Sequence, residues 1–481
     1  MRITNSMTTN KMLLNLNRNA NKVDNLYNQQ ISGKKIQLAS DNPIIASRAL
    51  KFRTNISETE QYARNVAQGL SWMEISEQGF TNMLDILRDI SGKCVQGAND
   101  PFAPTDRQKI ATEISALYAQ IGSEMNISYA GRYVFSGYRT DEPPTFEENN
   151  LLEYDITQAF ATVDIDKTKA YYRGGMDAAP EVHEVYRLKL PYSDAAMLGS
   201  PPVLTAKDAA GVTTTYTIVT TAVNPDGTPN ASSYTPGAND INFIPSTGEL
   251  ILGANVAQAL ATTGAGGISV DYHKAGFNKG ELNPKVYFTC TDTLAVPPMT
   301  YTMEHQELQF EFGVNTRITI NNQAKDVFTP QLYADLKEFV ELVAGVQLST
   351  DAALTAKYEG PPYNLSGEAL QNAIAEQKNE EEQKYRGILQ DRYSNIIEQL
   401  SRHSATANTE YTNLGSRMNR LDLIRTRLEE DRVSYTKLMS DNENVNYLEV
   451  MMELSAAESV YQAALKAGAS IMQLSLADFI R

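Results

Sequence analysis

Apolar residues recur at alternating spacings of three and four along both ends of the chain, a pattern typical of helices that pack along a seam. The first seam consists of Leu13, Leu16, Ala20, Val23 and Tyr27. The stretch "SGKKIQLASDNP" interrupts this seam, because Gly33 permits a turn. Pro43 suits the first position of a helix, with Asp41 or Asn42 as its cap. The pattern therefore predicts one helix, a break, and a second helix that begins at Pro43.

Two longer seams indicate long helices. From Ala49 to Leu87 one register holds for twelve positions, ten of them apolar, which corresponds to roughly 60 Å at the α-helical rise. After "EGPPYNLSG" a second register, from Leu389 to Leu438, holds for fifteen positions, of which eleven are apolar. A shorter helix is predicted over 110–125. Together these helices predict a helical rod to which both ends of the chain contribute.

The middle of the chain has a different pattern. Residues 146–350 contain runs rich in threonine, valine and tyrosine that are separated by turn signals such as "PDG", and such runs predict strands. We therefore expect an α+β fold, in which long coiled-coil-like helices from both chain ends flank a β-rich central insertion with one or two subdomains. The expected parts are an N-terminal assembly helix (1–42), the first part of the helical rod (43–145), the insertion (146–350), the second part of the rod (351–441) and a C-terminal assembly helix (442–481).

The last helix is predicted to have two apolar faces. One face contains Tyr447, Met451, Leu454, Tyr461, Leu465, Met472 and Phe479, and the other contains Val450, Ala457, Val460, Ala464, Ile471 and Leu474. Charged residues interrupt every long apolar run, so we expect no membrane insertion. The helix of residues 1–42 can cover one face, and the other face then requires a neighbouring molecule, which favours self-association. The candidate assembly residues are Leu13, Leu16, Val23, Tyr27, Tyr461, Leu465, Met472, Leu474 and Phe479.

Charge distribution adds to this picture. The net charge of −16 makes nucleic acid an unexpected partner for the whole molecule. Residues 1–57 hold nine Lys or Arg against two Asp, whereas residues 421–481 hold six Lys or Arg against ten Asp or Glu. The two ends are therefore electrostatically complementary, and scattered solvated charge is the alternative interpretation.

Candidate catalytic and metal sites are weak in this sequence. The four histidines are too scattered for a metal motif, and His403 falls on a helical seam, where it is interpreted as a core polar residue. Asp164 and Asp166 begin like a calcium loop, but Gly175 occupies the position that needs a glutamate. Cys94 and Cys290 are expected to be free, buried thiols. We therefore expect no enzyme activity, no cofactor and no metal, with a glycan-binding or enzymatic surface in the insertion as a remote alternative.

Five sequence motifs resemble the bacterial flagellin superfamily. They are "MRIT" at the start, "ISGKKIQLASDNPIIASRAL" from Ile31, "YAGRYVFSGYRTDEPPTF" from Tyr129, "NLGSRMNRLD" from Asn413 and "YQAALKAGASIMQLSLADFI" from Tyr461. The resemblance covers the two ends of the chain and little of the insertion. Within the superfamily, "YVFSGY" and "SLADFI" are more similar to the hook–filament junction branch than to filament flagellins.

The resemblance implies a structural role in bacterial motility. The protein would be a junction adaptor that connects the hook, through another hook-associated protein, to the flagellin filament; the alternative is a filament subunit. It would be exported by the flagellar type III apparatus without a cleaved signal peptide, with the help of an export chaperone. Its location would be extracellular, where paired terminal helices form an inner tube layer and the insertion faces outward.

Overall fold

The computed structural model describes residues 5–99, 102–172, 180–208, 210–221, 229–262, 267–303 and 306–479, with side chains described between Met7 and Ser470. These residues form two compact units. The described residues of Met1–Gln68, Glu311–Arg317 and Arg420–Arg481 make up the first, which we call the helical unit. Those of Gly69–Phe310 and Ile318–Asn419 make up the second, which we call the mixed unit.

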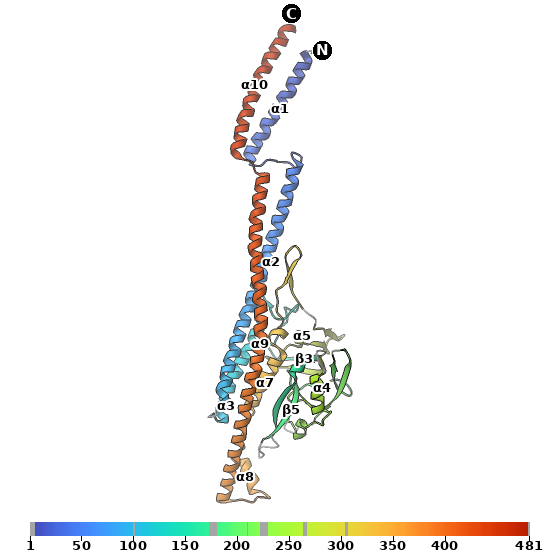
Figure 1. Cartoon of the computed structure of the whole chain (residues 1–481), viewed down its shortest axis with the longest axis vertical. Coiled ribbons are helices and arrows are strands. Elements are labelled where there is room, and N and C mark those ends of the chain that lie inside the picture. The colour runs from blue at the N-terminus through green and yellow to red at the C-terminus, as the bar shows by residue number, and fades with distance from the viewer. Residues whose placement is uncertain are drawn as a thin grey trace. The chain divides into compact units, whose positions relative to one another are not determined.

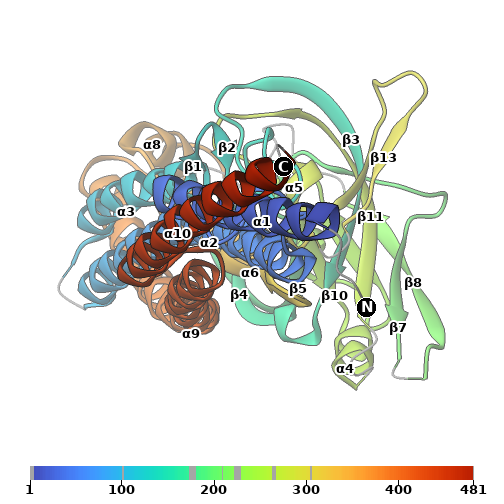
Figure 2. The same cartoon turned by 90° about the horizontal axis from the view of Figure 1, so that it is seen from above.

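The helical unit contains the two terminal helices and parts of two longer ones. Helices α1 and α10 lie side by side (Figures 1 and 2). Helices α2 and α9 continue from this unit into the mixed unit, and the strands β14 and β15 form a hairpin. The bounds are α1 (Asn5–Ser32), α2 (Pro43–Ala98), α9 (Gly367–Glu443), α10 (Tyr447–Phe479), β14 (Gln309–Gly313) and β15 (Thr316–Thr319).

The predicted break after the first helix is confirmed. Gly33 has a φ of 67°, which glycine adopts without a steric cost. The side-chain oxygen of Asn42 accepts hydrogen bonds from the N–H groups of Ile44 at 3.2 Å and Ile45 at 3.3 Å. Asn42 therefore caps α2, which begins at Pro43. Asp41 instead stabilises the preceding loop, since its carboxylate accepts from two backbone N–H groups there.

The long seam predicted on the last part of the rod is present in α9. Its buried members are Leu389, Tyr393, Ile396, Leu400, Ala407, Leu414, Leu421 and Leu428. The polar members within the mixed unit contact the segment 319–335. Arg417 donates to the carbonyl oxygens of Thr319 and Asn321, each at 3.0 Å, and His403 Nε2 lies 2.9 Å from Asp335 Oδ2. The polar residues of the α9 seam thus bind the segment that begins at the end of β15.

The mixed unit is built around one large sheet. Its strand order is β13-β12-β3-β11-β7-β8-β9-β10-β5-β4, with β6 paired to β11. The pair β8–β9 is parallel, and the central β3–β11 pair is antiparallel. The sheet strands are β3 (Asn150–Phe160), β4 (Asp166–Tyr172), β5 (Glu181–Lys189), β6 (Ala196–Met197), β7 (Val203–Lys207), β8 (Thr213–Thr220), β9 (Ile241–Ile244), β10 (Glu249–Leu252), β11 (Ile268–Phe277), β12 (Thr289–Asp292) and β13 (Met299–Tyr301).

Helices complete the mixed unit, and α3 packs against α7. The helices are α3 (Pro104–Met125), α4 (Ala254–Thr262), α5 (Pro284–Tyr287), α6 (Ala324–Val327), α7 (Pro330–Ala344) and α8 (Asp351–Glu359), and a small hairpin pairs β1 (Ser128–Tyr129) with β2 (Arg132–Tyr133). The α+β fold with a central β-rich region is therefore confirmed. After β15 the chain is helical, so the strands end well before residue 350.

The core of the mixed unit is aromatic. Tyr192 lies at the centre of a cluster with Tyr272, Phe277 and Phe288, with ring centroids 5.5–6.3 Å apart. Its hydroxyl donates to the carbonyl oxygen of Leu282 at 2.9 Å, so the buried polar atom is satisfied. Aromatic burial of this extent provides the mixed unit with a hydrophobic core of its own.

Candidate assembly surface

The seam between α1 and α10 has a small apolar core. Leu26 of α1 and Val450, Leu454 and Ala457 of α10 are buried together, and Val23 packs against them. The three α10 residues follow spacings of four and three, so they form one stripe on the helix. This stripe contains residues from both of the apolar faces that the sequence predicted for the last helix. The surface of α10 that contacts α1 therefore lies between the two predicted faces.

A glycine allows the two helices to approach closely farther along the seam. Gly468 of α10 is buried, and a Cβ atom added to it would lie 2.0 Å from Cε of Met12. The methionine side chain therefore occupies the space that a larger residue would need. The contact also explains why Met12, rather than its neighbour Leu13, faces the partner helix.

The nine predicted assembly residues fall into three groups. Leu16, Val23 and Tyr461 are half-buried. Leu13, Tyr27 and Leu465 are 45%, 52% and 43% exposed, so the predicted N-terminal seam is displaced by one residue at its ends, where Met12 and Leu26 are used instead. The side chains of Met472, Leu474 and Phe479 lie outside the described ones.

A polar clamp joins the chain segments at the base of the helix pair. The carboxylate of Glu443 accepts hydrogen bonds from the ammonium group of Lys34 at 3.1 Å and from the guanidinium group of Arg53 at 2.9 Å. The backbone N–H of Lys35 donates to the carbonyl of Glu443 at 2.7 Å, and that of Val445 donates to Gly33 at 3.1 Å. The predicted complementarity between a basic N-terminal and an acidic C-terminal segment is confirmed at this point.

The clamp perturbs the titration of its carboxyl group. Burial alone would raise the pKa of Glu443, but the hydrogen bonds from Arg53 and Lys34 outweigh it and hold this pKa below its usual value. The carboxylate is therefore ionised at neutral pH. Lys34 also donates to the side-chain oxygen of Asn444 at 2.7 Å, so its ammonium group bridges two residues of the opposite segment.

Large apolar side chains surround the seam without contacts that bury them. On α10 they are Tyr447, Leu448, Met451, Met452, Val460 and Leu465, and on α1 they are Met7, Leu13, Leu14, Tyr27 and Ile31. Many exposed large apolar side chains along one pair of helices are a feature of protein–protein interfaces. The described part of the chain does not supply a cover for it.

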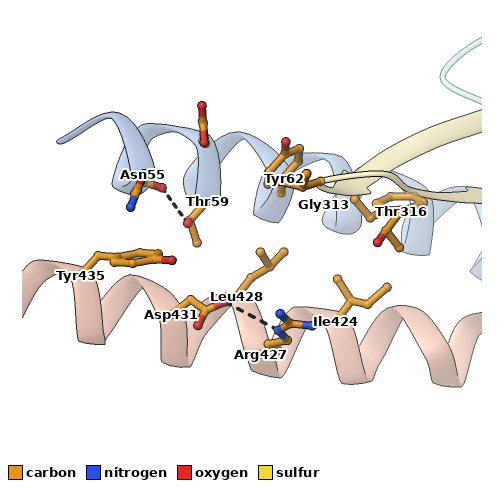
Figure 3. Close-up of a pocket in the computed structure, with 13 residues that line it drawn as sticks. Asn55, Thr59, Tyr62, Gly313, Thr316, Ile424, Arg427, Leu428, Asp431 and Tyr435 are labelled. Carbon is orange, nitrogen blue, oxygen red and sulfur yellow. Dashed lines mark hydrogen bonds and ion pairs between the residues drawn. The ribbon is translucent and has the colours of Figure 1, made fainter. Parts of the chain in front are cut away.

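The helical unit also contains a cavity of about 330 Å³ between α2, α9 and the β14–β15 hairpin. Figure 3 shows Thr59 of α2 and Leu428 of α9 on opposite sides of this space, with Gly313 and Thr316 of the hairpin at one end. Thr59 donates to the carbonyl oxygen of Asn55 at 2.7 Å. The lining mixes apolar with polar groups and contains no catalytic arrangement that we can recognise.

The residues that the sequence offered as weak candidates for metal binding or catalysis form contacts within the chain. Asp164 Oδ2 accepts from the N–H of Ala161 at 2.7 Å, and Asp166 lies 3.6 Å from the guanidinium group of Arg187. Cys94 and Cys290 are free and buried, and burial raises the pKa of each thiol to about 12. Among the described residues, no group of three or more His, Cys, Asp or Glu side chains could hold a metal ion. Within the same residues, no helix is both long and apolar enough to span a membrane.

Comparisons with known proteins support the resemblance read from the motifs. Residues 3–140 match the family described as the bacterial flagellin N-terminal helical region. Flagellar hook-associated protein 3 of Escherichia coli is 29% identical over 124 residues, which are 25% of this chain and 39% of that protein. A filament 31.3 kDa core protein of Treponema maltophilum is 32% identical over 90 residues, 19% of this chain and 32% of the relative.

The matched region is thus limited to less than half the length of these curated relatives. A solved structure of a putative flagellar hook-associated protein from Vibrio parahaemolyticus is 12% identical, with 84% of this chain and all of that chain covered at a TM-score of 0.38. The fold assignment therefore rests on this chain's own helices and strands. The resemblance to the flagellin superfamily, and to its hook-associated members, rests on the sequence match.

Proposed function

We propose that this chain, which carries a flagellin-type N-terminal helical region, is a structural, non-catalytic subunit of the flagellar hook–filament junction. The observation that carries the proposal is the pair of terminal helices, with a buried seam between α1 and α10 and uncovered apolar side chains around it. On this proposal, copies of the chain associate in a ring or tube through these side chains. A second hook-associated protein lies on the hook side and flagellin lies on the filament side.

The same surface has a consequence before assembly. Exposed Leu, Met and Tyr side chains on a free subunit favour aggregation, so an export chaperone that covers α1 and α10 is a fitting partner. Export through the flagellar type III apparatus, without cleavage of a signal peptide, is part of the proposal. The final location is outside the cell, at the junction.

The proposal is tested by complementation of a deletion strain of the source bacterium. Deletion should leave hooks without filaments and release filament protein into the medium, and the unaltered gene should restore filaments. Leu13→Asp and Leu465→Asp should fail to restore them, because both side chains are exposed on the terminal helices and a carboxylate there opposes an apolar interface.

The matched control is Val212→Asp, which also replaces an exposed aliphatic side chain by a carboxylate, but between β7 and β8 in the mixed unit. It should restore filaments fully. Normal filaments with Leu13→Asp and Leu465→Asp, at wild-type protein levels, would contradict the assignment of the assembly surface. Export of the variants into the medium separates a defect of assembly from a defect of folding.

A filament subunit is the second candidate, and the match to a filament core protein favours it. The two proposals predict different amounts of this chain in the flagellum. A junction subunit is needed only in small number, whereas a filament subunit forms most of the organelle. Quantitative mass spectrometry of sheared flagella should find this chain as a minor component. If it dominates the filament fraction, the junction proposal is wrong.

A further inference from the structure

The mixed unit contains a cavity that the assembly function does not explain. Its volume is about 330 Å³, within the range of roughly 300–1,000 Å³ that is usual for small-molecule pockets. It lies where β4 and β10 meet α7 and α9, and Tyr171, Glu249, Glu338 and Arg392 contribute to its walls. We propose that this cavity binds a neutral, hydroxyl-rich ligand of the size of a sugar ring.

Unused hydrogen-bond donors point to a ligand with oxygen acceptors. Among the described residues, the hydroxyl of Tyr171 and the Nε–H group of Arg392, both in the wall of the cavity, are buried without an acceptor. Buried polar groups are nearly always hydrogen-bonded, so two unmatched donors in the wall of one cavity favour a ligand that supplies acceptors. Sugar hydroxyl and ring oxygens provide such acceptors.

The charges around the cavity disfavour an anionic ligand. Glu249, Glu338 and Glu341 contribute three carboxylates, and Lys189 and Arg392 contribute two cations. Arg187 does not line the cavity, but it is almost completely buried and ion-pairs with two of these carboxylates and with Asp166. Its guanidinium group lies 2.5 Å from Glu249 Oε1 and 2.7 Å from Glu338 Oε1.

The remaining two cations also pair with Glu338. Lys189 lies 3.4 Å from its carboxylate and Arg392 lies 3.3 Å away. With three carboxylates against two cations in its lining, the cavity has no excess of positive charge to attract a phosphate or a polycarboxylate. The ion pair with Glu338 also holds the donor of Arg392 in a fixed position, which favours binding of a ligand with a defined arrangement of oxygens.

Two aromatic side chains complete the wall. Tyr171 and Tyr234 both line the cavity, and the Arg392 guanidinium lies over the Tyr171 ring at 5.3 Å from its centroid. Aromatic rings provide apolar surface with a polar edge, which suits a ligand that alternates C–H faces with hydroxyl groups. A small apolar ligand would leave the buried donors unmatched and is therefore disfavoured.

The experiment measures binding to the full-length chain by saturation-transfer NMR and calorimetry. The probes are methyl β-D-glucopyranoside, methyl α-D-mannopyranoside and, as a charged comparison, inorganic phosphate. We expect at least one glycoside to bind and phosphate not to compete with it. Tyr171→Phe, which removes only the hydroxyl, should weaken that binding roughly three- to tenfold.

Tyr186→Phe is the matched control, because Tyr186 lies on the surface of β5 and does not line the cavity. It should bind the glycoside as the unaltered chain does, and equal melting temperatures should show that both variants are folded. The proposal is overturned if neither glycoside binds at about 20 mM, so that water alone fills the cavity. It is equally overturned if phosphate competes, or if Tyr171→Phe leaves the affinity unchanged.

Discussion

The clamp at Glu443 predicts a local loss of stability when its charge is removed. In Glu443→Gln the side chain keeps its shape but no longer ion-pairs with Lys34 and Arg53. The Glu443 side chain is only 4% exposed, whereas those of Lys34 and Arg53 are 42% and 61% exposed. Solvent screens such pairs, so we assign about 0.5–1 kcal/mol to each and about 1–2 kcal/mol to both together.

Hydrogen exchange of the full-length chain can measure this loss at the place where it occurs. Opening of 33–45 and 441–447 should become roughly 5- to 30-fold more frequent, since about 1.4 kcal/mol corresponds to a factor of ten. Amides in the buried strands β3 and β11 should exchange as before, because they lie in the other unit. Glu430→Gln is the matched control, since Glu430 is an exposed glutamate on the same helix.

The pH dependence gives a second readout of the same clamp. The pKa of Glu443 is lowered in the folded state, so its stabilisation is present above the unfolded value of about 4.3 and is lost as the pH falls through the folded pKa. The difference between the Glu443→Gln variant and the unaltered chain should therefore be full at pH 7 and should shrink below about pH 4. The reasoning would be refuted if Glu443→Gln and the unaltered chain exchanged at equal rates at pH 7. It would also be refuted if Glu430→Gln had the same effect as Glu443→Gln.

Two further predictions concern packing and burial in the mixed unit. Gly97→Ala should destabilise by about 1–3 kcal/mol in urea unfolding, because the new Cβ would lie 2.3 Å from the ring of the fully buried Tyr393. Gly92→Ala, in the same helix with no atom within 4 Å of the new Cβ, should instead stabilise by up to about 1 kcal/mol, and equal effects of both would contradict this account. Burial raises the pKa of Asp335 despite its hydrogen bond with His403, so its contribution to stability is lost as the pH rises through that value. Asp335→Asn should therefore gain stability relative to the unaltered chain as the pH rises above about 4, and a difference that does not change with pH would be the contrary result.

Local signals in the sequence were sufficient to predict where the helix α2 begins. Asn42 and Pro43 could be placed because a cap and a first-turn proline act within a few residues. The seam of α9 could be placed because its register is maintained over many turns. The polar members of that seam could be identified, but their partners could not, since Arg417 contacts Thr319 and Asn321 from another part of the chain.

The faces of the terminal helices could not be fixed from one sequence. Seams that begin at Met12 and at Leu13 share Leu16, and both fit the three-four spacing. The choice between them depends on the partner helix, where Gly468 leaves room for Met12. The order of the strands in the sheet could not be predicted either, and neither could the three cations around Glu338. Both depend on contacts between distant segments, about which the alternation of residues along one strand carries no information.

The pairing of α1 with α10 also determines when this part of the molecule can form. Its two halves lie at opposite ends of the polypeptide, and the clamp joins residues separated by 409 positions in the chain. A chain that is threaded through a narrow channel from either end delivers one helix long before the other. The seam can therefore close only after both helices have emerged, so completion of the pair reports that every residue between them has arrived.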